Sequence, residues 1–337
     1  MEAGEMEPIN TGVIRSLHES DILLASRPKM PWPDQVLMIE PEFFDVEYVI
    51  NPHMESMIGS VDKNKAWVEW LALKSQFEKW GLYVHPIKGV KGLPDLVFCA
   101  NQSFPMWAED TGASFLMGAM RSPMRRSEVT YLNQVLAHKG YPVHTLFPTS
   151  HGNEASQAVE NDGTQIEMGD IDLPPLFFEG MGDVQWHPER SLIWAGHGFR
   201  TSMPALEALA LFTGIPIISL HLQDERLYHL DTCFCMLDEQ TVMIYPGAFD
   251  EVGLELIHHY FDVVLEIDKR ETLYSFACNA TAVAGKRILL PSDSPKTARL
   301  LASKGFTVVE LSTHEFLKSG GSIYCMKMLF WSHHVSL

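Results

Sequence analysis

The sequence predicts an α/β fold in which a strand, strand, helix, strand unit recurs five times and closes into one assembly. Two observations predict it. Helix-like stretches that end on or near glycine are followed at once by a short apolar strand, and two further strand-like runs precede each such pair. A unit of this kind cannot bury its sheet alone, so we expect the copies to pack against one another.

The junctions between helix and strand are the clearest part of the repeat. They read EKWGLYVHPI from Glu78, AHKGYPVHTL from Ala137, LFTGIPIISL from Leu211, HHYFDVVLEI from His258 and ASKGFTVVEL from Ala302. A left-handed residue is expected to end the helix at Gly81, Gly140, Gly214 and Gly305, with Asp262 in the equivalent place. The first copy, around QVLMIE and EYVINPH, is less regular than the others.

The repeats set the expected domain limits. Residues 34–332 should form a single domain, preceded by an N-terminal extension at 1–33 and followed by a short tail at 333–337. The stretch at about 150–172 is rich in Asn, Gly, Glu and Asp and interrupts the second copy. We interpret it as a surface insertion.

Composition excludes several classes of partner. The net charge of −18 argues against nucleic acid, which needs clustered Lys and Arg. The N-terminus MEAGEMEPIN lacks the basic start of a secretory signal, and no apolar run approaches the roughly 20 residues that span a bilayer. We therefore expect a cytoplasmic protein with no membrane partner.

The cysteines are odd in number and lack paired CxxC spacing. They are Cys99, Cys233, Cys235, Cys278 and Cys325. This pattern indicates neither a disulfide framework nor a metal site, and it leaves at least one free thiol.

Cys325 is the candidate nucleophile. It follows Gly320 and Gly321, which allow a tight backbone turn, in the stretch GGSIYC. A buried structural cysteine is the alternative for a lone residue of this type. Polar motifs elsewhere in the sequence favour a reactive cysteine over a structural one, because a nearby cation or histidine would stabilise the thiolate.

His229 and Asp231 are its candidate partners in YHLDT. If this stretch is a strand, both side chains face one way, as suits a proton-transferring histidine beside a carboxylate. A hydrogen-bonded strand histidine is the alternative. Cys233 and Cys235 continue the alternation, and we interpret them as packing residues.

Further polar candidates lie at the ends of apolar runs. Glu179 in FEGMGD either orients His229 or binds substrate, and Asp183 belongs either to the site or to a turn. Arg200 and Arg121 precede helices, where a guanidinium fits either a substrate carboxylate or a surface salt bridge.

These motifs together resemble a known superfamily of guanidino-modifying enzymes. The segments are EYVINPHM, PDLVFCANQSF, FEGMGD, GFRT, YHLDTCFC and GGSIYC. The superfamily includes arginine deiminases, dimethylarginine hydrolases and amidinotransferases, and the chain looks most like the arginine dihydrolase domain of cyanobacterial arginine-degrading enzymes. The resemblance implies a pentein fold, a five-bladed pseudo-symmetric α/β propeller of ββαβ repeats.

The resemblance also implies roles for individual residues. Cys325 would be the nucleophile and His229 the general acid and base, with Glu179 and Asp231 holding the guanidinium. The substrate carboxylate would be bound by Arg200 and Arg121, with Asn51 near the substrate. Asn101 stands where deiminases carry an aspartate. In the dihydrolases, an asparagine at this position accompanies removal of both guanidino nitrogens. The flanking residues, Cys99-Ala100-Asn101-Gln102-Ser103, depart from the family pattern.

The expected activity is therefore hydrolysis of the guanidino group of arginine through a covalent thiouronium, giving ornithine, ammonia and carbon dioxide. Arginine deiminase, dimethylarginine dimethylaminohydrolase and amidinotransferase activities are alternatives, as is a non-catalytic arginine-binding propeller. No cofactor or metal is expected, and the only partner predicted is a small guanidino substrate. A homo-oligomer is compatible with either kind of function.

Overall fold

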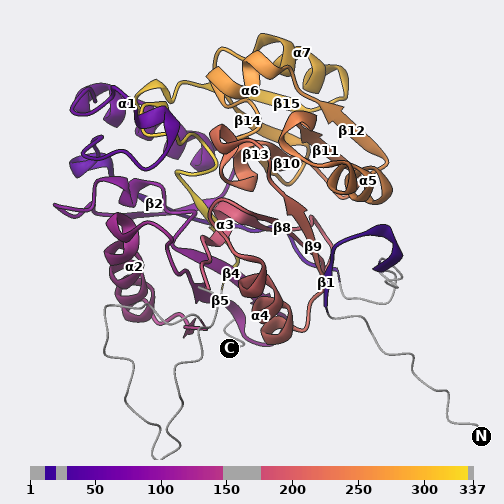
Figure 1. The fold of residues 1–337 in the computed structure, drawn as a ribbon. Coiled ribbons are helices and arrows are strands. Elements are labelled where there is room, and N and C mark those ends of the chain that lie inside the picture. Colours follow the sequence, from indigo (N-terminus) through magenta and orange to yellow (C-terminus); the bar gives the residue numbers. More distant parts are fainter. Residues whose placement is uncertain (1–11, 20–28, 147–175, 333–337) are drawn as a thin grey trace, which may run out of the picture.

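The computed structural model describes residues 12–19, 29–146 and 176–332, which form five separate mixed sheets (Figure 1). In every sheet the first strand pairs antiparallel with the second, and the second pairs parallel with the third. The expected α/β class is confirmed.

The five sheets share one strand order. They are β16 (Met328–Phe330), β2 (Gln35–Ile39) and β3 (Tyr83–Ile87); β4 (Ser103–Ala108), β5 (Gly112–Met117) and β6 (Val143–His144); β7 (Val184–Trp186), β8 (Ile193–His197) and β9 (Ile217–His221); β10 (Phe234–Met236), β11 (Thr241–Ile244) and β12 (Val263–Glu266); and β13 (Thr281–Val283), β14 (Arg287–Pro291) and β15 (Thr307–Leu311).

A helix connects the second strand of each sheet to the third. These helices are α1 (Lys63–Lys79), α2 (Arg126–His138), α4 (Met203–Thr213), α5 (Glu251–Tyr260) and α7 (Pro295–Ser303). They lie on the outside of the molecule, with the strands nearer its centre (Figure 1). Shorter helices occupy loops: α3 (Gly180–Asp183), α6 (Lys269–Ser275) and α8 (His314–Leu317).

All five predicted junctions between helix and strand are present. The glycines at 81, 140, 214 and 305 all have a positive φ, between 62° and 86°, as a left-handed helix end requires. In the copy that lacks glycine, α5 ends at Tyr260, Phe261 after it is extended with φ −116°, and Asp262 does not have the positive φ expected of it. The glycines therefore signalled real helix ends, and the strand that follows Asp262 does not need one.

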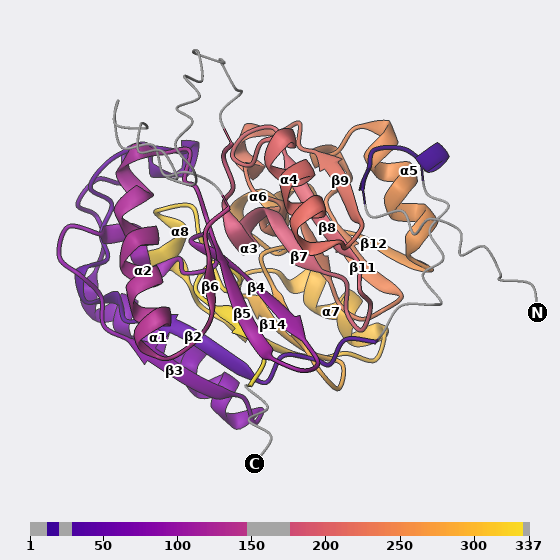
Figure 2. The same cartoon turned by 90° about the horizontal axis from the view of Figure 1, so that it is seen from below.

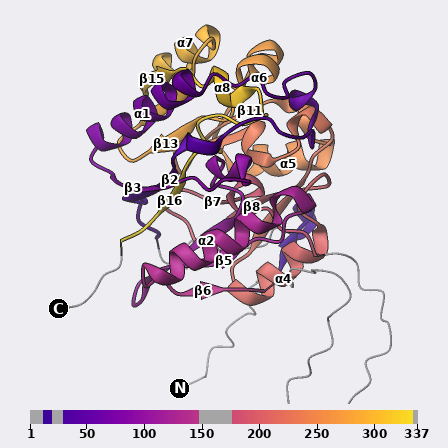
Figure 3. The same ribbon diagram turned by 90° about the vertical axis from the view of Figure 1, so that its left-hand side faces the viewer.

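The first copy differs from the expectation. EYVINPH does not form a strand, and the antiparallel partner of β2 comes from the other end of the described chain (Figure 3). In this register Met328 lies opposite Leu37 and Phe330 opposite Gln35. The sheet that contains the first long strand is thus completed by the last, which ties the ends of the domain together.

Both faces of the middle strands are buried, and alternate residues contribute to different cores. In β2, Leu37 and Ile39 belong to one hydrophobic cluster, whereas Val36 and Met38 belong to another. The same alternation separates Met243 from its neighbours in β11. Since successive strand residues point to opposite faces, each sheet packs against a neighbour on either side.

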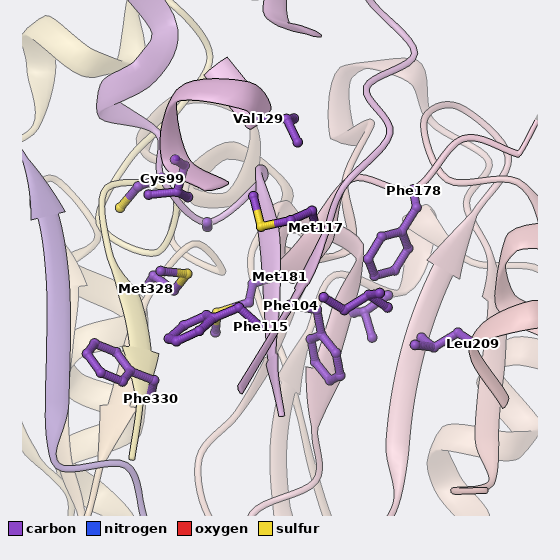
Figure 4. Packing of buried hydrophobic residues seen from close by; sticks show 14 of the residues in the cluster. Cys99, Phe104, Phe115, Met117, Val129, Phe178, Met181, Leu209, Met328 and Phe330 are labelled. Carbon is purple, nitrogen blue, oxygen red and sulfur yellow. The ribbon is translucent and has the colours of Figure 1, made fainter. Parts of the chain in front are cut away.

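The largest of these clusters joins three sheets. Figure 4 shows Phe115 and Met117 of β5 beside Met328 and Phe330 of β16, with Phe104 of β4 on the other side. Phe115 and Phe330 meet edge to face, with 5.4 Å between ring centroids. The C-terminal strand is therefore part of the largest core.

The segments outside the repeats agree only in part with the expectation. Val13–Ile14 form β1, which adds to β9 as a fourth, parallel strand, and Leu17–Glu19 lie beside α5 (Figure 2). The expected insertion at 150–172 and tail at 333–337 lie outside the described residues. Among those that are described, no helix has the length and apolar character to cross a membrane.

Replacing Phe330 by alanine should test the closure. Phe330 is 1% exposed, so Phe330→Ala is expected to lower the free energy of unfolding by about 3–5 kcal/mol, measured by denaturant titration. The control is Tyr274→Ala, because Tyr274 is 77% exposed and should change stability by less than about 0.5 kcal/mol. Equal effects would contradict a structural role for β16.

Candidate active site

Loops from all five sheets meet at one small pocket. Its lining residues are Ile50, Asn51, Met54, Asp95, Phe98, Asn101, Arg125, Arg200, Tyr228, His229, Ser319, Gly320, Gly321 and Cys325. Five of the residues singled out in the sequence are among them: Asn51, Asn101, Arg200, His229 and Cys325. We call this space the cysteine pocket.

Cys325 lies in the loop between α8 and β16 and is 4% exposed. Its thiol donates to Asp231 Oδ2 at 3.2 Å, and Asn279 Nδ2 donates to its sulfur, also at 3.2 Å. Asn279 Oδ1 in turn accepts the backbone N–H groups of Tyr324 and Cys325 at 3.0 and 3.4 Å. One asparagine therefore fixes both the loop and the sulfur.

The surroundings of the thiol keep it protonated in the free protein. Burial and the Asp231 carboxylate raise the pKa of Cys325 well above its ordinary value. Burial also raises the pKa of Asp231, to about 7. Among the described residues no cation is hydrogen-bonded to the thiol, and a cationic ligand would supply that contact.

Asp231 has one oxygen left over. Oδ2 accepts the thiol, whereas Oδ1 is buried and has no hydrogen-bond partner among the described residues. A buried carboxylate oxygen without a donor is costly unless a ligand brings one. The expected strand at 228–232 is wrong, because Leu230–Thr232 form a 3-10 turn, but this turn still places His229 and Asp231 at the site.

His229 is held by Glu179. Its Nε2 lies 2.7 Å from Glu179 Oε2, and the ring is almost fully buried. The same oxygen accepts Arg200 Nη1 at 3.1 Å, while Oε1 accepts the Arg121 backbone N–H at 3.0 Å. Burial alone would raise the pKa of Glu179, but Arg200 and His229 hold it well below its ordinary value. Glu179 therefore stays ionised and orients the histidine.

Arg200 and Asn51 form another part of the wall of the cysteine pocket. Arg200 donates to Ile50 O at 3.0 Å, and its guanidinium stacks 4.6 Å from the Tyr228 ring. The Asn51 amide donates to Ser319 O at 3.1 Å and accepts the His53 N–H at 2.9 Å. Both side chains border the pocket and are positioned by neighbours.

Asn101 has a fixed orientation that the sequence did not reveal. Arg125, which is 4% exposed, donates from Nη1 to Asn101 Oδ1 at 2.9 Å and pairs with Glu128 at 2.8 Å. Since Arg125 can only donate, the oxygen of the amide must face it. The Asn101 Nδ2 group is buried without a partner among the described residues.

Four predicted site residues are not part of the pocket lining: Glu179 and Asp231, which contact His229 and Cys325, and Asp183 and Arg121. Both Asp183 oxygens accept backbone N–H groups, from Leu230 and Thr201, each at 3.1 Å. The Arg121 side chain is exposed and donates to Phe199 O at 2.7 Å. These contacts tie Asp183 to the base of the histidine turn, and its contact with substrate stays a prediction.

The structure adds Asp95, Arg125, Tyr228 and Asn279 to the site. Asp95 and Tyr228 stand inside the quoted motifs PDLVFCANQSF and YHLDT, so the signal was present. Arg125 and Asn279 stand in stretches that carry no recognisable motif. Gly182 also matters, because a Cβ there would lie 2.3 Å from Asn101 Nδ2 and 3.3 Å from the His229 ring.

Comparison with known proteins gives consistent relatives. The family model of eukaryotic N,N-dimethylarginine dimethylhydrolases matches residues 50–330. The bifunctional arginine dihydrolase/ornithine cyclodeaminase AgrE of Nostoc sp. is 33% identical over 297 residues, which are 87% of this chain and 37% of that protein. The N(G),N(G)-dimethylarginine dimethylaminohydrolase of Mycobacterium tuberculosis is 31% identical over 297 residues, 88% of this chain and 86% of that protein.

Solved structures agree. The N-terminal domain of ArgZ bound to product, an arginine dihydrolase from the cyanobacterial ornithine–ammonia cycle, matches with a TM-score of 0.75 and 30% identity, over 88% of this chain and 96% of that chain. A dimethylarginine dimethylaminohydrolase adduct matches with a TM-score of 0.68 at 18% identity, which supports the fold alone.

The matched family and these relatives are hydrolases that act on carbon–nitrogen bonds. More narrowly, the chain belongs to the N,N-dimethylarginine dimethylhydrolase family, whose model covers most of its length. The resemblance inferred from the motifs is confirmed. The chain spans only about 37% of the length of AgrE.

Replacing Asp231 by asparagine should make the free thiol more acidic. Asp231→Asn removes the negative charge beside the sulfur, so the midpoint for alkylation of Cys325 by iodoacetamide should move down by about one pH unit or more. The rate is measured by mass spectrometry against pH.

Exposed Asp110→Asn is the control and should leave this midpoint unchanged. An unchanged or higher midpoint in Asp231→Asn would mean that the carboxylate does not control the thiol.

Proposed function

We propose that this protein hydrolyses arginine through Cys325 and removes both guanidino nitrogens, as an arginine dihydrolase. The observation that carries the proposal is a pair of buried groups without partners. Asp231 Oδ1 can only accept while ionised, and Asn101 Nδ2 can only donate. A guanidinium supplies donors to the first, and a ureido oxygen supplies an acceptor to the second.

In the first reaction the guanidinium binds against Asp231 and lowers the pKa of the Cys325 thiol by its charge. His229 takes up the thiol proton, and the thiolate attacks the guanidino carbon. His229 then protonates the departing ammonia, which leaves a covalent thiouronium. Water, activated by His229, displaces the sulfur and gives citrulline with the thiol restored.

In the second reaction the ureido oxygen accepts a hydrogen bond from Asn101. The thiolate attacks the ureido carbon, and a second ammonia leaves with a proton from His229. Hydrolysis of the resulting thiocarbamate releases N-carboxyornithine, which loses carbon dioxide to give ornithine. Because charge on the ureido oxygen grows as the thiolate adds, a fixed donor there stabilises the transition state.

Binding of the amino-acid end would use the other wall. Arg200 and Asn51 border the pocket, and Arg200 carries donors suited to an α-carboxylate. Arg121 lies outside this lining, and its guanidinium donates to the Phe199 carbonyl. Glu179 positions groups for both ends of the substrate, since one of its oxygens holds His229 and Arg200.

Dimethylarginine hydrolysis is the second candidate, favoured by the family model and the mycobacterial relative. Methyl groups would leave Asp231 Oδ1 with fewer donors, and that reaction has no use for Asn101 Nδ2 once citrulline has formed. The buried polar atoms therefore favour unmodified arginine.

We also infer that the five sheets are the blades of one five-bladed α/β propeller. Its catalytic domain would span residues 34–332. The common strand order, the shared cores and the pairing of β16 with β2 support this arrangement. The extension at 1–33 would add β1 to the sheet of β9.

A product assay with guanidino-labelled arginine tests the proposal. Wild-type protein should form ornithine, labelled carbon dioxide and ammonia in a ratio of about one to one to two, as the reaction requires. Cys325→Ala should lower turnover by about 10⁴-fold or more, since the nucleophile is lost. Citrulline as the sole end product would remove the second reaction, and activity in Cys325→Ala would remove the mechanism.

Replacing Asn101 by aspartate should separate the two reactions. Asn101→Asp exchanges the donor for an acceptor beside Arg125, so ornithine formation from citrulline should fall about tenfold or more beyond any loss of citrulline formation from arginine. Both rates are measured from the labelled products. Asn64→Asp, on an exposed turn of α1, is the control. Parallel loss of both rates in Asn101→Asp would contradict a specific role in the second reaction.

A further inference from the structure

The first strand of every sheet contributes to a second pocket that lies beyond the cysteine pocket. Its lining includes Pro105 of β4, Gln185 of β7, Met236 of β10, Thr281 of β13 and Leu329 of β16. β16 contacts β4, and β10 contacts β13, so these strands face one another. Its cavity volume of about 100 Å³ exceeds the roughly 10 Å³ of the cysteine pocket.

The two pockets lie toward opposite ends of these strands. Asn101 and Cys325, which border the cysteine pocket, come just before β4 and β16, whereas Leu329 and Trp331 of the second pocket lie in β16 and just after it. Residues of the second pocket thus follow those of the first along the same strands. We call it the rear pocket.

Lys327 projects into the rear pocket from the junction between Cys325 and β16. Its side chain is fully buried, and its Nζ has no hydrogen-bond partner among the described residues. The ammonium lies 3.1 Å from the centre of the Tyr324 ring. A buried amine without an acceptor carries a large desolvation cost, which a ligand oxygen would relieve.

Two more polar groups without partners line the same pocket. Gln185 Nε2 and Thr281 Oγ1 are buried, and neither makes a hydrogen bond within the described chain. Together with Lys327 they present three donors from three different strands or loops. Donors that line one pocket match a carboxylate, whose two oxygens offer about four acceptor sites.

The remaining walls are apolar. The indole N–H groups of Trp186 and Trp331 are turned away, to Pro105 O at 2.8 Å and Pro31 O at 2.7 Å, so the rings offer hydrocarbon surface. Glu189 also lines the pocket and accepts the Trp32 indole N–H at 3.0 Å. Its charge disfavours ligands with more than one negative charge.

We propose that the rear pocket binds a small monocarboxylate with an apolar or aromatic body. The carboxylate accepts hydrogen bonds from Lys327, Gln185 and Thr281, and the body packs between the tryptophans. Pockets with apolar walls and a few polar groups are typical ligand sites. The proposal does not depend on which substrate the cysteine takes.

A bound carboxylate would also change the protonation of Lys327, because burial of the amine alters its pKa. Burial lowers the pKa of this amine to about 7. The opposite, raising influence comes from nearby acidic groups: Asp231, Cys235, Cys99 and Cys325. A carboxylate in contact would stabilise the ammonium form.

Calorimetric titration of the full chain tests the proposal. The probe is 3-phenylpropionate, and its uncharged isostere 3-phenylpropionamide is the comparison. We expect one acid to bind per chain, about tenfold or more tightly than the amide. No binding of the acid, or equal binding of acid and amide, would overturn the proposal.

Substitutions locate the site. Lys327→Met should weaken binding of 3-phenylpropionate by about tenfold or more, and Thr281→Val by about threefold or more. Thr281→Val removes a hydroxyl that has no internal partner, so the fold should survive even where Lys327→Met does not. Exposed Lys91→Met is the matched control for loss of charge and should leave affinity unchanged. Unchanged affinity in Thr281→Val and in folded Lys327→Met would overturn the proposal.

Competition distinguishes the rear pocket from the cysteine pocket. The titration is repeated on Cys325→Ala saturated with arginine, which this variant should not consume. The acid should still bind with the same stoichiometry. Displacement by arginine would place the acid at Arg200 and would overturn the rear-pocket assignment.

Discussion

The structure depends on each sheet burying both of its faces against neighbours. In β2, alternate residues enter two separate cores, and the same is true of β11 and β14. A sheet buried on both faces is not stable alone, because water would contact one of its apolar sides. Closure by β16 on β2 satisfies this constraint for the first sheet. The loops that precede the first strands are brought together as a consequence, and the cysteine pocket forms where they meet.

Burying charged side chains around the cysteine pocket costs desolvation free energy, and neighbouring groups of opposite charge offset that cost. Glu179 is fully buried, and Arg200 and His229 keep it ionised. Arg125 is balanced by Glu128 in the same manner. A buried charge with several partners is tolerated, whereas one with none is costly. Three of the buried polar atoms that have no hydrogen-bond partner in the described chain are Asp231 Oδ1, Asn101 Nδ2 and Lys327 Nζ. Each lies at or beside a pocket, where a ligand can supply the missing hydrogen-bond partner.

Much of the site could be predicted because its residues stand in short motifs next to recognisable elements. Cys325, His229 and Glu179 were found in this way, although the strand expected around His229 is a 3-10 turn. The sequence leaves Asp183 open between the site and a turn, because spacing does not tell a carboxylate that binds a ligand from one that binds backbone N–H groups. Arg125 and Asn279 act through contacts 24 and 46 residues away, which no local pattern reveals.

The sequence by itself determined the repeat, the helix ends and the chemical character of the site. Each of these follows from local preferences: glycine allows a left-handed backbone, alternation of apolar residues sets strands, and a thiol, an imidazole and carboxylates limit the chemistry. Only the tertiary structure decided which strand closes the first sheet, which polar atoms are left without partners, and that a buried lysine faces a second pocket. These depend on contacts between residues far apart in the chain, because burial and hydrogen bonding are properties of the packed molecule.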